Sequence, residues 1–353
     1  MPKKHLNIED FENFIIIQTA FLGDIALSLY LIQAIKDVHP ISTITFITTK
    51  EGAEIAKIAN CIDKTIVFDK RGEHRTNKAM KSFAQQFNSL KKKCVISLHK
   101  SFRTSKLVSN IKSKVKIGFN TSSLSWLVYN HIQTYHNSLN EVQRNLSILN
   151  LFGLKLNDSE IKLNISFSTN TKEKIAEILT ENSFNDEFIV LAPGSVWATK
   201  RWLPEYFSEL INILNEVGKN CIIIGAKNDT EINKKIYEKV KNKNKTLDLT
   251  GLTNIEESIY VISKAKFIVS NDSSPTHFSE LVGTPVVTIF GPTSPIFGFA
   301  PRLSKSFVIE NNELNCRPCQ IHGSNQCPLK TLECMTSVTP QKVFEIIEKN
   351  ILI

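Results

Sequence analysis

The chain has 353 residues, of which 42% are hydrophobic and 22% charged, and its formal net charge is +9. This composition excludes a globally disordered protein, and the length suits two domains of ordinary size. The apolar run from Phe14 to Ile17 is interrupted by Gln18 and Thr19, so we expect neither a membrane span nor a signal peptide, and a cytoplasmic protein.

Short apolar runs alternate with longer amphipathic stretches along the first half, which predicts βα units and parallel sheet. A helix is predicted from near Asp24, because apolar residues recur every three to four positions until Pro40. The strands predicted in this half are residues 14–19, 43–48, 65–68, 94–98 and 115–119.

The second half repeats this alternation after a polar stretch, residues 157–186, that contains one predicted helix. Its predicted strands are residues 187–193, 221–225, 267–271 and 286–290. We therefore predict an α/β protein with two Rossmann-like, doubly wound domains, residues 1–165 and 166–353, facing each other across a cleft. The last helical pattern, residues 340–351, is a candidate to pack back across both domains.

The usual nucleotide fingerprints are absent from the sequence. Neither G-x-G-x-x-G after a strand nor G-x-x-x-x-G-K-[ST] occurs in the chain. A dehydrogenase or a P-loop kinase would need one of them, so these two classes are disfavoured.

The positive charge is concentrated in the first domain. Residues 71–116 contain thirteen Lys or Arg and a single acid, Glu73. Such a run forms either a solvated face or a surface for an anion, such as phospholipid headgroups or a phosphorylated glycolipid. We predict no nucleic-acid partner, because the segment lacks interleaved aromatic residues and any known nucleic-acid-binding pattern.

Asp24 is the first candidate for chemistry. It follows the first predicted strand in T-A-F-L-G-D, and ligands of parallel sheets gather at the carboxyl ends of strands. Its carboxylate either caps the following helix or accepts a proton from an attacking hydroxyl. Gly23 beside it would let a substrate approach the backbone closely.

A second candidate is the segment A-P-G-S-V-W-A-T-K-R-W-L-P-E, residues 192–205. Loop amides, the hydroxyl of Ser195 and the ammonium of Lys200 suit a diphosphate, although Lys200 is also compatible with an ordinary surface position.

The third candidate, residues 267–293, is the most specific. A buried strand ends at Asn271, Asp272 and Ser273 follow, and a helix is predicted from Pro275 with His277 in its first turn. Free N–H groups and the positive end of the helix dipole would converge there, which favours a nucleotide diphosphate.

These segments together resemble the ADP-heptose lipopolysaccharide heptosyltransferases, glycosyltransferase family 9, and the likeness extends over nearly the whole chain. The matching segments are LGD at 22–24, SFRTSK from 101, QRN at 143–145, PGS…KRW from 193, IIIGAKNDTE from 222, DLTG from 248, NDSSPTH from 271 and FGPTSP from 290. The resemblance implies the two-lobed GT-B fold and an inverting transfer of L-glycero-D-manno-heptose that requires no cofactor for catalysis.

The resemblance also implies roles for individual residues. Asp24 matches the catalytic base, Lys200 the lysine on the donor phosphates, and Ser273 with His277 the diphosphate-binding pair. Asp272 matches the acidic position of that turn, and Glu231 matches the carboxylate near the adenosine ribose. The sequence departs from the family at Ser274, where the family usually has glycine, and a side chain at this turn would shift the donor.

The partners implied are ADP-heptose and a Kdo-lipid A or heptosyl-Kdo-lipid A acceptor of a Gram-negative envelope. Lys100 and Arg103, after the 94–98 strand, are the predicted acceptor-side cations, and a peripheral position on the inner membrane face follows. The segment TAFLGDIALSLYLIQAIKDVHP is most similar to heptosyltransferase II, while the first and third transferases stay open.

Four cysteines gather near the end of the chain, at Cys316, Cys319, Cys327 and Cys334. They are either reduced thiols without a ligand or the ligands of a structural Zn or Fe ion. Two other functions stay open as well: a nucleotide-sugar-binding protein without catalysis, and a two-lobed sugar-nucleotide epimerase.

Overall fold

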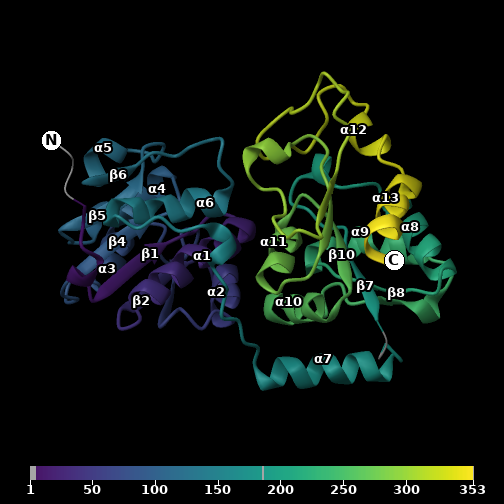
Figure 1. The fold of residues 1–353 in the computed structure, drawn as a ribbon, viewed down its shortest axis with the longest axis horizontal. Coiled ribbons are helices and arrows are strands. Elements are labelled where there is room, and N and C mark those ends of the chain that lie inside the picture. The colour runs from purple at the N-terminus through teal and green to yellow at the C-terminus, as the bar shows by residue number, and fades with distance from the viewer. Residues whose placement is uncertain (1–4, 185–186, 353) are drawn as a thin grey trace. The chain divides into compact units, whose positions relative to one another are not determined.

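The structure is a computed structural model that describes residues 5–184 and 187–352, and residues 1–4, 185–186 and 353 lie outside the described part. The chain divides into two compact units, Met1–Ser166 and Phe167–Ile353. Each unit contains a six-stranded sheet in which every strand pair is parallel (Figure 1).

The first unit is a regular alternation of strands and helices. Its strands are β1 (Asn13–Ile17), β2 (Thr43–Thr48), β3 (Lys64–Val67), β4 (Lys93–Ser97), β5 (Val115–Phe119) and β6 (His131–Gln133). Its α-helices are α1 (Leu22–Val38), α2 (Lys50–Lys57), α3 (Asn77–Gln85), α4 (Phe102–Asn110), α5 (Ser125–Val128) and α6 (Glu141–Leu146).

Helices cover both faces of this sheet, so the interior residues of its central strands are buried and mostly apolar. Phe14 to Ile17 of β1 are fully buried, as expected for a strand covered on both sides. Helix α1 contacts α2 and α6, whereas α4 contacts α3 and α5. A core of β1, β4, α3 and α4 side chains, including Ile17, Phe83 and Leu107, fills one side.

The second unit begins with α7 (Thr169–Glu181) and then repeats the alternation. Its strands are β7 (Phe188–Ala192), β8 (Asn220–Ile223), β9 (Thr246–Asp248), β10 (Phe267–Asn271), β11 (Val286–Ile289) and β12 (Phe307–Ile309). Its other α-helices are α8 (Pro204–Glu216), α9 (Thr230–Lys239), α10 (Ile255–Lys264), α11 (Ser274–Leu281), α12 (Glu333–Thr336) and α13 (Pro340–Ile347).

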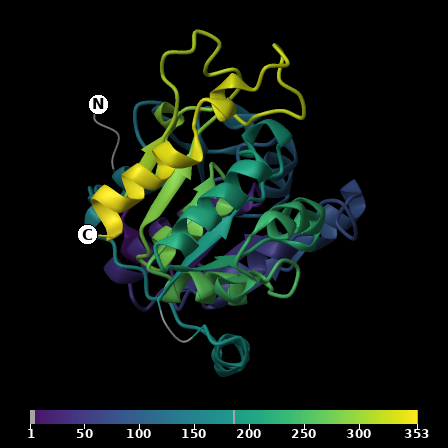
Figure 2. The same ribbon diagram turned by 90° about the vertical axis from the view of Figure 1, so that its right-hand side faces the viewer.

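The core of the second unit lies between its sheet and the helices α8, α9 and α13. Trp202, Phe207 and Phe344 are among its buried side chains, and the Trp202 indole N–H donates to Val338 O at 2.7 Å. Figure 2 shows α13 and α8 side by side, and the two helices are in contact. Helix α13 therefore packs on helix α8 of the second unit.

Both sheets have the same strand order. The first runs β3-β2-β1-β4-β5-β6 and the second runs β12-β11-β10-β7-β8-β9, which is the doubly wound Rossmann order in each case. This confirms the predicted fold class of two Rossmann-like domains. Strands β6, β9 and β12 were not predicted, because each has only three residues and lies at a sheet edge. Within the described residues, the helices are all too short or too polar to cross a membrane.

Candidate functional site

Each sheet has one place where the chain reverses its winding direction, and the predicted site residues gather at these two places. In the first unit the reversal lies between β1 and β4, which Asp24 and Lys100 follow. In the second unit it lies between β7 and β10, which Lys200 and Asp272 follow. Doubly wound sheets bind ligands beyond the carboxyl ends of the strands at such a point.

Asp24 is the third residue of α1, and Gly23 before it is buried. The side chain of Asp24 accepts hydrogen bonds from the backbone N–H groups of Phe21 and of Asp24 itself, so it also stabilises the start of the helix. The residue keeps part of its surface exposed, yet burial of its carboxyl group raises the pKa to about 7. The Glu141 carboxylate adds to this rise and the Lys100 ammonium opposes it, so the carboxyl is poised to exchange a proton near neutral pH.

Lys100 lies in the loop between β4 and α4, close enough to act on Asp24 electrostatically. Its Nζ stands 3.6 Å from the centre of the Tyr135 ring, in a cation–π contact. Burial lowers the pKa of Lys100, whereas the carboxylates of Glu141 and Asp24 raise it. The lysine is therefore held among Asp24, Tyr135 and Glu141.

A buried network around Arg144 fixes the Tyr135 ring and the Glu141 carboxylate. Nη1 of Arg144 lies 3.1 Å from Oε2 of Glu141, and both side chains are almost fully buried. The Tyr135 hydroxyl donates to the same oxygen at 2.7 Å and accepts from Arg144 Nη1 at 3.1 Å. Arg144 also donates to the carbonyl oxygens of His136 and Asn137. Sequence reasoning singled out only the QRN segment here and missed Tyr135 and Glu141.

Arg103, the other predicted acceptor-side cation, has partners within the protein. Its Nη2 donates to the backbone carbonyls of His74 and Arg75, both at 2.6 Å. It therefore fastens the loop before α3 to α4. Lys70, which sequence reasoning missed, donates to Thr19 O at 2.6 Å and so reaches the loop that precedes Asp24.

In the second unit, Lys200 forms an ion pair with Asp272 across the two switch-point loops. Nζ of Lys200 lies 2.7 Å from Oδ2 of Asp272, with the side chains 13% and 9% exposed. The Thr293 hydroxyl donates to the same Asp272 oxygen at 2.6 Å. Ser195 lies in the same loop as Lys200, and its carbonyl accepts from Arg201 Nε at 2.8 Å. The structure thus brings Lys200 and Asp272 together, which sequence separation alone does not indicate.

Asn271 holds these two loops in register. Its Oδ1 accepts from the backbone N–H of Trp202 at 2.9 Å, and its Nδ2 donates to Pro193 O at 2.7 Å. Both bonds join the end of β10 to the loop after β7. Because the amide is fully buried, the loops are fixed by bonds that water cannot replace easily.

Helix α11 begins at Ser274, with Ser273 as its N-cap residue and Pro275 in its first turn. His277 is buried, and its Nδ1 lacks a hydrogen-bond partner among the described residues. Burial lowers the pKa of His277 to about 4, while Asp272 opposes this and Lys200 and Arg302 add to it. The imidazole is therefore neutral at neutral pH and can donate one N–H group to an anion.

Glu231, predicted near a ribose, lies in the first turn of α9 with its side chain 87% exposed. Asp229, two residues earlier, is closer to the Ser195 loop. A Cβ on Gly194 would lie 2.6 Å from Oδ2 of Asp229, so a side chain at this position would displace the Asp229 carboxylate. Burial raises the pKa of Asp229. Sequence reasoning missed this residue, although NDTE contains both carboxylates.

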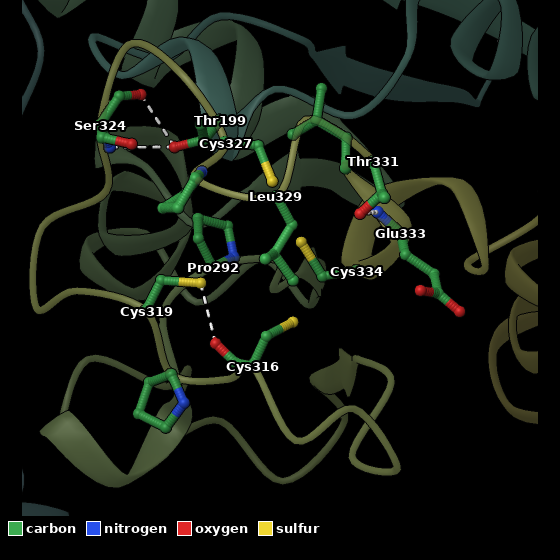
Figure 3. Close-up of a pocket in the computed structure, with 13 residues that line it drawn as sticks. Thr199, Pro292, Cys316, Cys319, Ser324, Cys327, Leu329, Thr331, Glu333 and Cys334 are labelled. Carbon is green, nitrogen blue, oxygen red and sulfur yellow. Dashed lines mark hydrogen bonds between the residues drawn. The ribbon is translucent and has the colours of Figure 1, made fainter.

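The four clustered cysteines line one pocket of about 350 Å³, between Thr199 and Pro292 (Figure 3). Cys334 is buried and Cys316 is exposed, with Cys319 and Cys327 between these extremes. Among residues 5–184 and 187–352, no group of three or more His, Cys, Asp or Glu side chains is arranged to hold a metal ion.

The segment that carries these cysteines braces the Lys200 loop. Ser324 and Thr199 exchange hydrogen bonds through backbone and hydroxyl groups at 2.8 to 3.0 Å. Gly323 has φ of +84°, and a Cβ there would lie 2.8 Å from Cγ of Lys200. Cys319 N donates to Pro292 O at 2.8 Å. The cysteine segment thus contacts both the Lys200 loop and the loop after β11, and Thr293 of the latter donates to Asp272.

Comparisons with known proteins agree on one family. Residues 80–331 match the family model described as Glycosyltransferase family 9 (heptosyltransferase). The chain is similar to the lipopolysaccharide core heptosyltransferase OpsX of Haemophilus influenzae, with 25% identity over 344 residues that cover 95% of each protein.

Two solved structures share the fold over nearly the whole chain. A family 9 glycosyl transferase from Veillonella parvula has a TM-score of 0.86 and 19% identity, covering 99% of both chains. The ADP-heptose lipopolysaccharide heptosyltransferase II of Escherichia coli has a TM-score of 0.76 and 18% identity, covering 96% of this chain and 98% of the other.

Proposed function

Because the chain belongs to glycosyltransferase family 9, we propose that it transfers L-glycero-D-manno-heptose from ADP-heptose to the Kdo/heptose inner core of lipopolysaccharide. The observation that carries this proposal is that each unit holds a site of different chemistry at its switch point. One switch point holds a carboxyl group with its pKa near neutrality, and the other holds a cation, a neutral imidazole and a helix N-terminus. The first suits a general base and the second suits a diphosphate leaving group.

Asp24 acts as the general base in this proposal. Its carboxylate accepts the proton of the acceptor hydroxyl while that oxygen attacks the anomeric carbon of the heptose, with inversion. Lys100 lies beside Asp24 and opposes the rise in its pKa, so part of the population is ionised at neutral pH. Tyr135 and Glu141 hold Lys100, and the Glu141 carboxylate also raises the pKa of Asp24 directly.

The second unit binds the donor in this proposal. Lys200 and His277 donate to the diphosphate oxygens, and Ser273 with the amides of α11 adds hydrogen bonds where negative charge grows on ADP. Lys200, the neutral His277 and the helix amides stabilise the charge of the departing ADP, and the proposed transfer requires no metal for catalysis. Ser195 and Gly23 stay proposed donor contacts, and Asp229 is a second candidate beside Glu231 for the ribose.

The acceptor is proposed to be Kdo-lipid A or heptosyl-Kdo-lipid A. The carboxylates and phosphates of this acceptor suit the cationic first unit, and Lys100 and Arg103 are the candidate residues to bind them. A lipid-anchored acceptor implies a cytoplasmic protein that works peripherally on the inner membrane face. The resemblance of residues 19–40 to heptosyltransferase II makes that transferase the preferred assignment.

Release of ADP from ADP-heptose, with and without acceptor glycolipid, tests the proposal. We expect ADP to appear only when the acceptor is present. A sugar-nucleotide epimerase would convert the donor without acceptor, and a binding protein would release no ADP under either condition. Either of these results would overturn the assignment as a transferase.

We also propose that Cys316, Cys319, Cys327 and Cys334 hold a structural Zn or Fe ion. Four thiolates are the ligand set that both metals accept, and all four residues line the same pocket. To bind the ion, the four sulfur atoms would have to come closer to one another than they are in the structure. A bound ion would brace the segment that contacts the Lys200 loop.

Metal analysis of protein purified without chelator tests this second proposal. We expect a single Zn or Fe ion per chain, lost in a Cys316→Ser/Cys319→Ser variant. A Cys61→Ser variant is the matched control, because Cys61 is a buried thiol of the first unit. A structural ion would be refuted if the wild-type protein contained no metal and if the Cys316→Ser/Cys319→Ser variant were as stable and active as the wild type.

A further inference from the structure

Helix α5 presents large apolar side chains to solvent. Trp126 is 79% exposed and Leu127 is 64% exposed, although the next two residues, Val128 and Tyr129, are buried. The Tyr129 hydroxyl lies 3.1 Å from Oγ of Ser105 on α4, which fixes the short helix on the first unit. Trp126 and Leu127 therefore contribute little to the core, and their exposure is set by the fold.

The surroundings of α5 are cationic. Residues 74–140 contain twelve Lys or Arg and not one Asp or Glu. Asn130, directly after the helix, accepts from Lys116 N at 2.8 Å and donates to Lys114 O at 2.5 Å. Lys112 and Lys114 are exposed. The apolar pair thus lies beside a lysine-rich turn, with every acidic residue outside this long segment.

Apolar side chains beside cations match an anionic phospholipid bilayer. Tryptophan prefers the membrane–water interface because its ring is amphipathic, and clustered lysines are attracted to anionic headgroups. A protein partner would need an acidic, apolar surface to match the same features, and the bilayer supplies both properties over a continuous plane. The charge complementarity therefore favours a membrane as the occupant.

We propose that α5 and the lysines of residues 112–116 are the surface with which the protein docks on an anionic bilayer, with Trp126 and Leu127 inserted among the headgroups. The inference rests on the proposed function, because a lipid-anchored acceptor brings the protein to a membrane. The turn before α5 also contacts the candidate acceptor loop, since Ser123 N donates to Lys100 O at 2.9 Å. Docking through α5 would place that loop near the glycolipid.

Vesicle binding by the full-length chain tests this proposal. The probes are vesicles of phosphatidylcholine alone and of phosphatidylcholine mixed with phosphatidylglycerol, and the readouts are sedimentation and tryptophan emission. We expect binding to the anionic vesicles only, weakened by salt, with an emission shift to shorter wavelength that requires Trp126. Lys112→Glu/Lys114→Glu should weaken binding by at least about fivefold for each lysine. Lys234→Glu/Lys235→Glu on α9 changes the net charge equally and should leave binding unchanged.

The apolar part has its own variant and control. Trp126→Ser/Leu127→Ser should lower vesicle affinity at least about tenfold. Ile41→Ser removes another exposed apolar side chain of the first unit, 87% exposed, and should have little effect. Equal binding by both variants would overturn the proposal, as would wild-type binding to neutral vesicles as strong as to anionic ones.

Transfer to detergent-dispersed acceptor separates this inference from the proposed function. The Trp126→Ser/Leu127→Ser variant should keep that activity, which also shows that it folds. If wild-type protein transfers heptose but does not bind vesicles, the docking surface is wrong and the function stands. If it binds vesicles through α5 but transfers no heptose, the docking surface stands and the function is wrong.

Discussion

Replacing Asp24 with asparagine removes the proposed base while it keeps the size of the side chain. The variant should lower kcat by roughly 10²- to 10⁴-fold, the usual contribution of a positioned general base. Binding of ADP should be unchanged, because the proposed diphosphate contacts all lie in the second unit. Asp24→Ala should behave in the same way.

The same substitution should also stabilise the protein above neutral pH. Burial raises the pKa of Asp24 from 3.8 to about 7, so the folded state binds the proton more tightly than the unfolded state. Protonation of Asp24 therefore stabilises the folded state. This contribution is fully present below the pKa of the unfolded state, 3.8, and is lost as the pH rises through the pKa of the folded state, about 7. The Asp24→Asn variant has no such loss, so its free energy of unfolding relative to that of the wild type should rise by roughly 3 kcal/mol between about pH 5 and pH 8.

The assays are the pH dependence of kcat/KM and urea unfolding of both proteins at the two pH values. Wild-type activity should rise with pH through about 7 as Asp24 loses its proton. Glu141→Gln should move this limb to lower pH, because Glu141 raises the Asp24 pKa. Lys100→Met should move it to higher pH. A merely structural role for these neighbours would change stability without moving the limb.

Near-normal turnover of Asp24→Asn would refute the role of Asp24 as base. A limb near pH 4 in the wild type would refute the reasoning about burial, even if the variant were inactive. A shift to higher pH in Glu141→Gln, or to lower pH in Lys100→Met, would show that the charges around Asp24 do not act as the structure indicates.

Three further predictions concern other charged groups. Lys200→Met should raise the KM for ADP-heptose and lower the free energy of unfolding by about 3–5 kcal/mol, because it leaves Asp272 buried without its cation. The double variant Lys200→Met/Asp272→Asn should recover the stability in urea unfolding but should keep the raised KM. Arg144→Met should destabilise the first unit by a similar amount, about 3–5 kcal/mol, since Glu141 then loses its partner, and unchanged unfolding would contradict this. His277→Ala should weaken ADP binding about tenfold in calorimetry at neutral pH, because the variant loses the N–H group that the neutral imidazole donates, and unchanged affinity would contradict this.

Most of the fold could be predicted because both sheets are covered on two faces. Strands such as β2, β5 and β10 are almost fully buried and rich in Ile, Val and Phe, and their predicted and observed ranges coincide. The three strands that were missed pair on one side only, and each is a partly exposed segment of three residues, which is too short to give a recognisable strand pattern. The predicted final helix continued to residue 351, whereas α13 ends at Ile347 and a π-helical turn, Glu348–Leu352, follows.

The candidate site could be predicted only where its residues follow strands that the sequence itself predicts. Asp24, Lys200 and Asp272 do so, and the roles given to them stay predictions. Tyr135 and Glu141 follow the edge strand β6, and only the packing of α6 brings them toward Lys100. Sequence spacing cannot specify such side-chain contacts, because they depend on how distant segments pack.

The most direct measurement of the central claim is the mass of the glycolipid after incubation of wild-type protein with ADP-heptose and defined truncated cores. We predict that one core structure gains the mass of a single heptose, and that Asp24→Asn protein leaves every core unchanged. Wild-type protein that binds ADP-heptose yet adds heptose to none of the cores would contradict the proposed transfer.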